Sequence, residues 1–178
     1  MDGRDGESHC YSMPECSQVY FKRSLDGGNT WEPDMRLTTD STYSARPVVT
    51  SIANRVFISY DHSQANDGND AYLLESDDGG GSWHSAQRIS HSKAADHTTS
   101  LADNSFLFLA SMDMRHPGNV SFWMSNGSKI NFLPEEQVSP GSEAGAAYLS
   151  ATSNYAHVLW PDRRTGTWQW FYRRRFKQ

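Results

Sequence analysis

The sequence contains one eight-residue pattern twice, as "SLDGGNTW" at residues 24–31 and as "SDDGGGSW" at residues 76–83. Both copies read Ser-x-Asp-x-Gly-x-(Thr/Ser)-Trp, and 52 residues separate them. A third stretch, "SNGSKINF" at 125–132, keeps the serine and the final aromatic residue after a further 49 positions. This spacing predicts a chain built from repeats of about fifty residues.

Two further landmarks follow the same intervals. They are the segment endings "RLT" (36–38), "RIS" (88–90) and "QVS" (137–139), and the aspartates Asp61, Asp113 and Asp162. Between the landmarks, short apolar runs alternate with turn residues and show no helical spacing. We therefore predict thirteen strands and no helix, arranged as two strands of one unit, two units of four strands, and three strands of a last unit.

Four antiparallel strands in about fifty residues are typical of one blade of a β-propeller. We predict an all-β, single-domain propeller over residues 1–178. Its parts are an N-terminal extension (1–18), two strands of a split blade (19–38), two blades (39–90 and 91–139) and an incomplete last blade (140–178).

The predicted blade number has a consequence for assembly. The chain supplies about three blades, whereas closed propellers typically have 4–8. We expect two chains to form a six-bladed ring, in which each chain donates its N-terminal strand to the partner's last blade. The alternative is that the chain is a fragment or half-propeller of a larger protein.

The repeated pattern itself is predicted to close a hairpin turn. The aspartate and the hydroxyl side chains can bond backbone N–H groups in a tight turn, and glycine adopts positive φ without strain. The tryptophan can pack beneath the turn. These residues are Ser24, Asp26, Gly28, Thr30 and Trp31 in the first copy, and Ser76, Asp78, Gly80, Ser82 and Trp83 in the second. A catalytic or calcium-binding role for the aspartates is less favoured, because the third copy has lost its aspartate and glycine.

The pattern resembles the Asp box (BNR repeat) of the sialidase or neuraminidase superfamily. The stretch "WPDRRTGTWQWFYRRR" (160–175) also resembles bacterial BNR-repeat proteins. The resemblance extends from about residue 19 over nearly the whole chain. It implies a propeller of the sialidase kind, usually six-bladed, with the Asp boxes on the rim opposite the active-site face.

The same resemblance implies an arginine cluster for a substrate carboxylate, a tyrosine nucleophile activated by a glutamate, and an aspartate acid/base. The weak candidates are Tyr148 as nucleophile, Glu143, and the arginines Arg46, Arg115 and Arg163. The Arg-Ile-Pro segment of the family is absent, however. Tyr148 also aligns with ordinary strand positions of the other repeats, Pro47 and Thr99, so an inward-facing tyrosine of the core explains it.

Polar residues gather at the strand ends opposite the predicted turns. The candidates for a ligand face are Asp61, His62, Asp113, His116, Trp160 and Asp162. Capping of turns is the favoured role of the three aspartates, and a ring of carboxylates for a cation or sugar hydroxyls is the alternative. We favour a non-catalytic scaffold that binds carbohydrate or another protein, with an exo-sialidase as the alternative.

Composition and motifs exclude several classes of function. The net charge of −5 argues against general nucleic-acid binding, and no apolar run has the length of a membrane span. The sequence predicts no cofactor and no metal, since it lacks zinc-ligand spacing and a phosphate-binding loop. Cys10 and Cys16 could form a disulfide or stay free, and a cytoplasmic or an extracellular location is open.

Overall fold

The computed structural model describes residues 17–39, 43–63, 68–114, 118–126, 130–139 and 143–177. These parts contain thirteen strands and no helix, so none of them holds a helix that could cross a membrane. The strands are β1 (Tyr20–Phe21), β2 (Met35–Arg36), β3 (Ser44–Ile52), β4 (Arg55–Ser63), β5 (Asn69–Ser76), β6 (Gln87–Arg88), β7 (Ala95–Ala102), β8 (Phe106–Asp113), β9 (Asn119–Asn126), β10 (Glu136–Gln137), β11 (Tyr148–Ala151), β12 (Tyr155–Asp162) and β13 (Gln169–Phe176).

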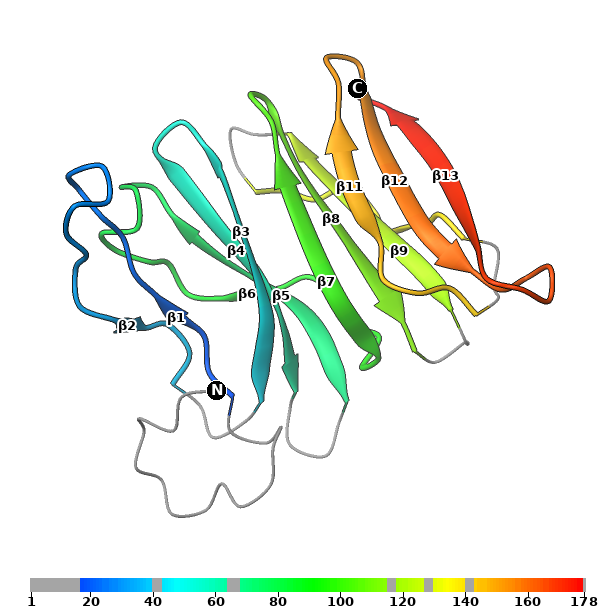
Figure 1. The fold of residues 1–178 in the computed structure, drawn as a ribbon, viewed down its shortest axis with the longest axis horizontal. Helices are drawn as coiled ribbons and strands as arrows, with labels where there is room; N and C mark the ends of the chain where they lie inside the picture. Colours follow the sequence, from blue (N-terminus) through cyan, green and yellow to red (C-terminus); the bar gives the residue numbers. More distant parts are fainter. Residues whose placement is uncertain are drawn as a thin grey trace.

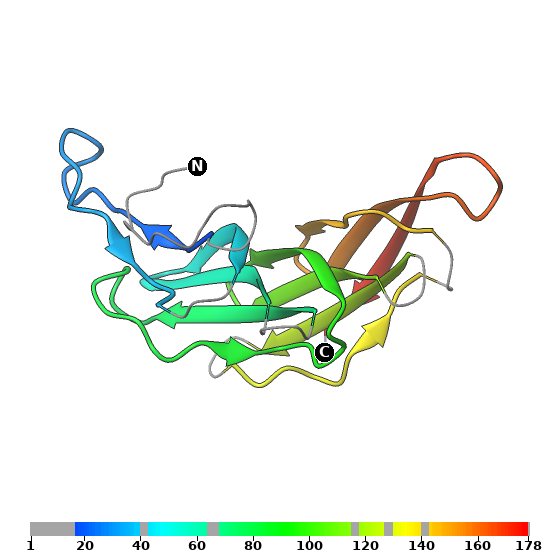
Figure 2. The ribbon, with the colours of Figure 1, turned by 90° about the horizontal axis from the view of Figure 1, so that it is seen from below.

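The strands form four antiparallel units in the order of the chain. An N-terminal hairpin pairs β1 with β2; the first sheet has the order β3-β4-β5-β6, the middle sheet β7-β8-β9-β10, and the last sheet β11-β12-β13. The units lie side by side from the blue hairpin to the red β13 in Figure 1, and Figure 2 shows the same row from below. The prediction of an all-β fold with four-stranded antiparallel units is confirmed.

The middle sheet is buried on both faces because both of its neighbours pack against it. Leu107 and Leu109 of β8 pack with Phe57 and Leu73 of the first sheet. The residues between them along β8 face the other way, and Phe108 packs in the cluster that includes Val158 and Trp160 of the last sheet. This explains why β8 reads as a nearly continuous apolar run, since side chains alternate between the two faces of a strand.

Strand pairing shows how the first and middle sheets correspond. The first strand of each sheet has a bulge, after which Val48 pairs with Ser59 and Thr99 pairs with Ala110. Equivalent residues in the first two strands of these sheets are therefore 51 positions apart in the sequence. The two turn motifs, by contrast, are 52 positions apart. Equal spacing in the sequence thus does not mark equal positions, because the connecting turns differ in length.

This register corrects one expectation from the sequence. Asp61 corresponds to Met112, and Asp113 corresponds to His62. A shift of one residue reverses the face of a strand to which a side chain belongs. Asp61 therefore points toward the middle sheet, whereas Asp113 lies on the face of the middle sheet that is turned toward the first sheet. The three aspartates do not form one ring of equivalent carboxylates.

Asp113 and Asp162 do hold corresponding positions. Each ends the second strand of its sheet. Asp113 pairs with Ala95 of β7, and Asp162 forms a bridge with Ala144, four residues before β11, just as Ala95 lies four residues before Thr99. The predicted 49-residue interval is thus structurally correct between the middle and last sheets.

Candidate functional site

The 24–31 turn is closed by hydrogen bonds of the repeated side chains. Ser24 Oγ accepts from the Gly28 N–H at 2.8 Å and donates to Asp26 Oδ1 at 2.7 Å. Asp26 in turn accepts from the Thr30 N–H at 2.8 Å and from the Thr30 hydroxyl at 2.6 Å. Gly28 has φ of 92°, a left-handed conformation that favours glycine.

The 76–83 turn repeats this network residue by residue. Ser76 Oγ accepts from the Gly80 N–H at 2.8 Å, and Asp78 accepts from the Ser82 N–H at 2.8 Å and from its hydroxyl at 2.7 Å. Gly80 has φ of 88°. The prediction that the repeated pattern closes a turn agrees with both sets of hydrogen bonds.

These hydrogen bonds also determine the ionisation of the two carboxyl groups. The Thr30 hydroxyl and N–H, followed by the Ser24 hydroxyl, lower the pKa of Asp26 to about 2. The Ser82 N–H and hydroxyl, with the Ser76 hydroxyl, lower the pKa of Asp78 further below its usual range. Neither carboxyl group is suited to donate a proton near neutral pH, since both stay ionised as hydrogen-bond acceptors.

The aromatic ends of the two turns differ. Trp83 packs edge-to-face against Phe21 of the N-terminal hairpin, with ring centroids 5.1 Å apart. Trp31 is 60% exposed, so the expectation that it packs beneath its turn is wrong. The reason is that Phe21, the partner of Trp83, belongs to the preceding unit, and the described residues include no unit before the N-terminal hairpin.

A polar cluster lies at the opposite ends of the first and middle sheets. Arg46 forms ion pairs with both Asp61 and Asp96, and its Nε lies 2.7 Å from Asp61 Oδ2. Tyr43 Oη accepts a further contact from Arg46 Nη1 at 3.4 Å, and His97 Nδ1 lies 2.9 Å from Asp96 Oδ2. The Arg46 guanidinium is thus shared between two carboxylates.

Asp61 connects the two sheets as well as binding Arg46. Its side chain is fully buried, and it accepts from the backbone N–H groups of His97 at 2.9 Å and Thr98 at 3.1 Å. Arg46 and His97 hold corresponding bulge positions and both have positive φ, of 54° and 51°. Bulges of this kind redirect side chains at strand ends, and here they bring Arg46 onto Asp61.

The other predicted ligand-face residues are mostly buried. His62 is 7% exposed and its Nδ1 lies 2.9 Å from Ser44 Oγ, and Asp113 is 5% exposed. Trp160 is 2% exposed between the middle and last sheets. The Trp160 ring thus packs between two sheets and is not available to a ligand.

The last sheet and the segment before it hold several of the candidates from the sequence. Asp162 is buried and pairs with Arg164, whose N–H it accepts at 2.8 Å. Glu143 Oε2 lies 3.6 Å from Arg163 Nη1. Tyr148 is 58% exposed and packs on Trp170, with ring centroids 5.8 Å apart, on the outer face of the last sheet. Arg115, His116, Cys10 and Cys16 lie outside the described residues.

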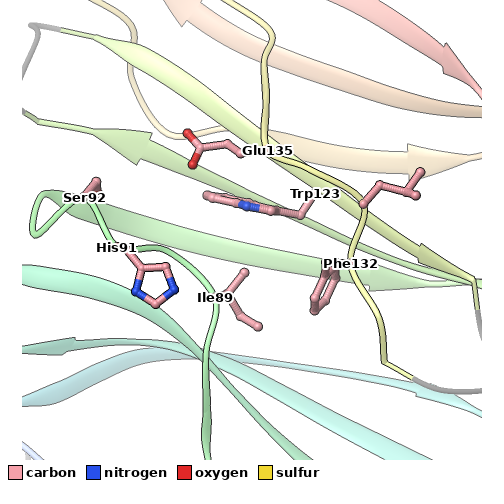
Figure 3. Close-up of a pocket in the computed structure, with 7 residues that line it drawn as sticks. Ile89, His91, Ser92, Trp123, Phe132 and Glu135 are labelled. Atoms are coloured by element: carbon pink, nitrogen blue, oxygen red, sulfur yellow. The ribbon is translucent and has the colours of Figure 1, made fainter.

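A pocket of about 420 Å³ lies between the middle sheet and the segment that leads into it from the first sheet. Its lining residues are Ile89, His91, Ser92, Trp123, Phe132, Leu133 and Glu135. Figure 3 shows the Trp123 indole between Glu135 on one side and Ile89 and Phe132 on the other. The volume falls in the range of small-molecule sites, roughly 300–1,000 Å³.

The pocket combines apolar and polar groups. Ile89, Phe132 and Trp123 form an apolar floor, and Trp123 is itself 5% exposed. Glu135 Oε1 accepts from Ser121 Oγ at 2.5 Å, which holds the carboxylate at the rim. Among the described lining residues there is a carboxylate but neither lysine nor arginine. Such a site suits an uncharged ligand with hydroxyl groups better than an anion.

The sequence interpretation missed this pocket. Phe132 was recognised only as the aromatic residue of the third, altered repeat motif, and nothing in the local pattern set Trp123, His91 or Glu135 apart. The pocket arises where the connection from the first sheet meets the middle sheet, which no single repeat reveals. Over the described parts of the chain, no group of three or more His, Cys, Asp or Glu side chains is arranged to hold a metal ion.

Comparisons with known proteins agree with the fold. No family model and no curated protein matches the sequence. A Hadza microbial sialidase aligns with a TM-score of 0.61 at 13% identity, over 92% of this chain and 39% of that one. A mutant of NanB sialidase from Streptococcus pneumoniae aligns with a TM-score of 0.56 at 12% identity, over 82% of this chain and 24% of that one. The fold is a sialidase-like β-propeller, and the chain spans less than two fifths of the length of these sialidases.

Proposed function

We propose that the chain is a non-catalytic, sialidase-like propeller module that serves as a glycan-binding or interaction scaffold. The observation that carries this proposal is the pairing of Arg46 with Asp61 and Asp96. An arginine that grips a substrate carboxylate needs a free guanidinium fork, because its planar donors bind the carboxylate bidentately. In this chain two internal carboxylates compete for that fork.

The positions of the remaining catalytic candidates support the same proposal. Tyr148 packs on Trp170, while Glu143 lies beside Arg163. A tyrosine nucleophile needs a base within hydrogen-bond reach, since its ordinary pKa of about 10 keeps it protonated at neutral pH. The exo-sialidase alternative is favoured by one observation, the sialidase fold of the solved neighbours, and fold alone does not determine function.

The pocket around Trp123 is the best candidate for a carbohydrate site. Sugar rings present an apolar C–H face that packs on apolar side chains, and their hydroxyls donate to carboxylates such as that of Glu135. The negative charge of Glu135 disfavours sialic acid and other acidic sugars there. The proposed ligand class is therefore a neutral sugar.

Two assays test this function. The first measures hydrolysis of a fluorogenic sialoside, for which we expect no turnover above a boiled control. Robust turnover that is lost in the Tyr148→Phe variant would overturn the proposal in favour of an exo-sialidase. The second measures binding to a glycan array, where we expect signal on neutral rather than sialylated glycans. Signal confined to sialylated glycans would contradict the assignment of the pocket.

We also propose that a second copy of the chain completes the propeller to six blades. Large exposed apolar side chains are concentrated at the two ends of the row of sheets. They are Tyr20, Leu25, Trp31 and Met35 in the N-terminal hairpin, and Tyr148, Leu159, Trp168, Trp170, Tyr172 and Phe176 in the last sheet and its loop. Exposed apolar patches of this kind mark contact surfaces. Sedimentation equilibrium tests the proposal, since we expect twice the mass of the 20.1 kDa chain.

A further inference from the structure

The last sheet can be compared with the middle sheet residue by residue. Asp113 and Asp162 correspond, and they pair with Asn119 at the start of β9 and with Gln169 at the start of β13. Both pairings continue without interruption along the strands. The residues that follow Asn119 and Gln169 therefore correspond one by one.

This correspondence identifies a contact face without a neighbour. Val120 and Phe122 of β9 are fully buried against the last sheet. Their counterparts in β13, Trp170 and Tyr172, are 61% and 55% exposed. The positions that bury β9 between sheets thus carry large aromatic side chains in β13, and in the described residues no further sheet covers them.

A hydrogen bond that recurs in several units shows which residues of the N-terminal hairpin correspond to Trp170 and Tyr172. In three units, a hydroxyl side chain after the last strand accepts a hydrogen bond from a backbone N–H in or beside the strand before it. The pairs are Val19 N to Thr38 Oγ1 at 2.9 Å, Ala71 N to Ser90 Oγ at 2.9 Å and Val120 N to Ser139 Oγ at 2.7 Å. Val19 therefore corresponds to Val120, and through it to Trp170. In the same way Phe21 corresponds to Tyr172.

The first sheet has a complementary gap. Val49 and Ser100 occupy corresponding positions, since each is the second residue paired after the bulge in the first strand of its sheet. Ser100 is 7% exposed because the first sheet covers it, and its hydroxyl accepts from Ser59 Oγ at 2.9 Å. Val49 is 63% exposed, since the N-terminal hairpin supplies only the outer two strands of a unit. Among the described strands, the hairpin beside the first sheet has no counterpart of the two inner strands that the last sheet contains.

We propose that the last sheet of one copy binds the first sheet of a second copy at the position held there by that copy's own β1. This inference rests on the two-chain propeller proposed above and names its contact. Tyr172 takes the place of Phe21 beside Trp83 of the second copy, and Trp170 takes the place of Val19. β2 of the second copy then becomes the fourth strand of the last sheet, and Thr38 of the second copy accepts from the Trp170 N–H.

The geometry favours a second copy as the occupant for two reasons. Within the described residues, the N-terminal hairpin has two strands where a full unit has four, and the last sheet has three, so each end of the row could be completed by the other. β1 is also short, because it pairs with β2 through two residue pairs, Tyr20 with Arg36 and Phe21 with Met35. β13 is eight residues long, and among the described strands it pairs only with β12. β1 and β13 are therefore competitors for one site, and β1 restrains association until a second copy displaces it.

Sedimentation velocity over a concentration series tests this competition with three variants. Trp170→Ala removes an exposed ring of the monomer, and we expect it to weaken dimerisation at least tenfold. Phe21→Ala loosens β1, and we expect it to strengthen dimerisation at least threefold. Met114→Ala is the matched control, because Met114 is 59% exposed and directly follows β8 of the middle sheet, away from both ends of the row, and we expect no change.

The outcomes separate this contact from the broader proposals. A dimer that Trp170→Ala leaves intact would overturn the contact while keeping a two-chain assembly. A dimer that Phe21→Ala weakens would overturn the displacement of β1. Monomers for both the unmodified chain and Phe21→Ala, with folding confirmed by circular dichroism, would overturn the contact and the six-bladed ring together. None of these results changes the glycan assays, which test the sugar site separately.

Discussion

The buried carboxylate of Asp61 accepts the backbone N–H of His97 at 2.9 Å, across the junction between the first and middle sheets. The same carboxylate pairs with Arg46 of its own sheet. One side chain therefore bonds across the junction of two sheets and pairs with Arg46, the arginine that the resemblance to sialidases suggested for substrate binding. Asp61 is structural in both of these contacts, which argues against the carboxylate ring considered from the sequence.

The first prediction concerns this junction. Asp61→Ala leaves two buried backbone N–H groups without their acceptor and removes one of the two carboxylates that pair with Arg46, and removal of one partner of a buried pair costs roughly 3–5 kcal/mol. Because Arg46 is 37% exposed, we expect the lower end, about 3 kcal/mol, in the free energy of urea unfolding. The control is Asp34→Ala, which breaks the surface pair with Lys22 and should cost about 0–1 kcal/mol. Equal costs for the two variants would contradict the role assigned to Asp61.

The second prediction concerns the acid stability of the 24–31 turn. The pKa of Asp26 is lowered from 3.8 to about 2 by its hydrogen bonds in the folded state. A lowered folded pKa stabilises the protein above the unfolded pKa, and this contribution disappears as the pH falls toward the folded value. The unfolding free energy of the unmodified protein should therefore fall more steeply between about pH 4 and pH 2 than that of Asp26→Asn. Parallel curves for the two proteins in chemical denaturation would show that the turn does not shift this carboxyl group.

The third prediction uses two glycines with the same backbone conformation. Gly28 and Gly80 have φ of 92° and 88°. A Cβ on Gly28 would meet open space, whereas a Cβ on Gly80 would lie 2.5 Å from the Phe21 ring. Gly28→Ala should lower stability by about 1–2 kcal/mol through backbone strain alone. Gly80→Ala should cost about 1–3 kcal/mol more, because it also overpacks the contact with the hairpin.

The measurement for the two glycine variants is thermal and urea unfolding. The double variant Gly80→Ala with Phe21→Ala provides the control, since removal of the ring should recover most of the additional cost. If Gly80→Ala is no worse than Gly28→Ala, the N-terminal hairpin is not packed on the second turn as described.

The fourth prediction concerns the pocket around Trp123. Glu135→Gln keeps the size of the side chain and removes its charge, and hydrogen bonds to a charged group are the stronger ones. We expect about tenfold weaker binding of neutral methyl glycosides, a factor that corresponds to 1.4 kcal/mol, measured by ligand-observed NMR. The matched control is Glu143→Gln in the last sheet, which should leave binding unchanged. Equal effects of both variants would argue against a sugar site in this pocket.

Much of the fold was predictable from the sequence, because the same turn motif and strand pattern occur in successive repeats and support one another. The paired turn motifs at 24–31 and 76–83 set the repeat length, and their hydrogen bonds depend on residues at most four positions apart. The alternation of short apolar runs with turns predicted the order of the strands. Both signals are local, so neither needed knowledge of the tertiary structure.

The candidate site was less predictable. The spacing suggested that Asp61 and Asp113 are equivalent, but the register assigns Asp61 to the position of Met112. Equal spacing in the sequence does not reveal this one-residue difference in register, because turns of unequal length compensate for it. The pocket was missed for a related reason, since Ile89 lies in the connection after β6 and Trp123 lies in β9 of the middle sheet.

The sequence by itself determined the repeat, the strand order and the chemistry of the turns, because these follow from residues close together in the chain. Only the tertiary structure decided which side chains meet between sheets. It placed Arg46 against two carboxylates, buried Trp160, and left Trp170 and Tyr172 exposed. The physical reason is the alternation of side chains along a strand. The neighbour of each face depends on pairing register and on which sheet packs beside it, and both are properties of the assembled sheets.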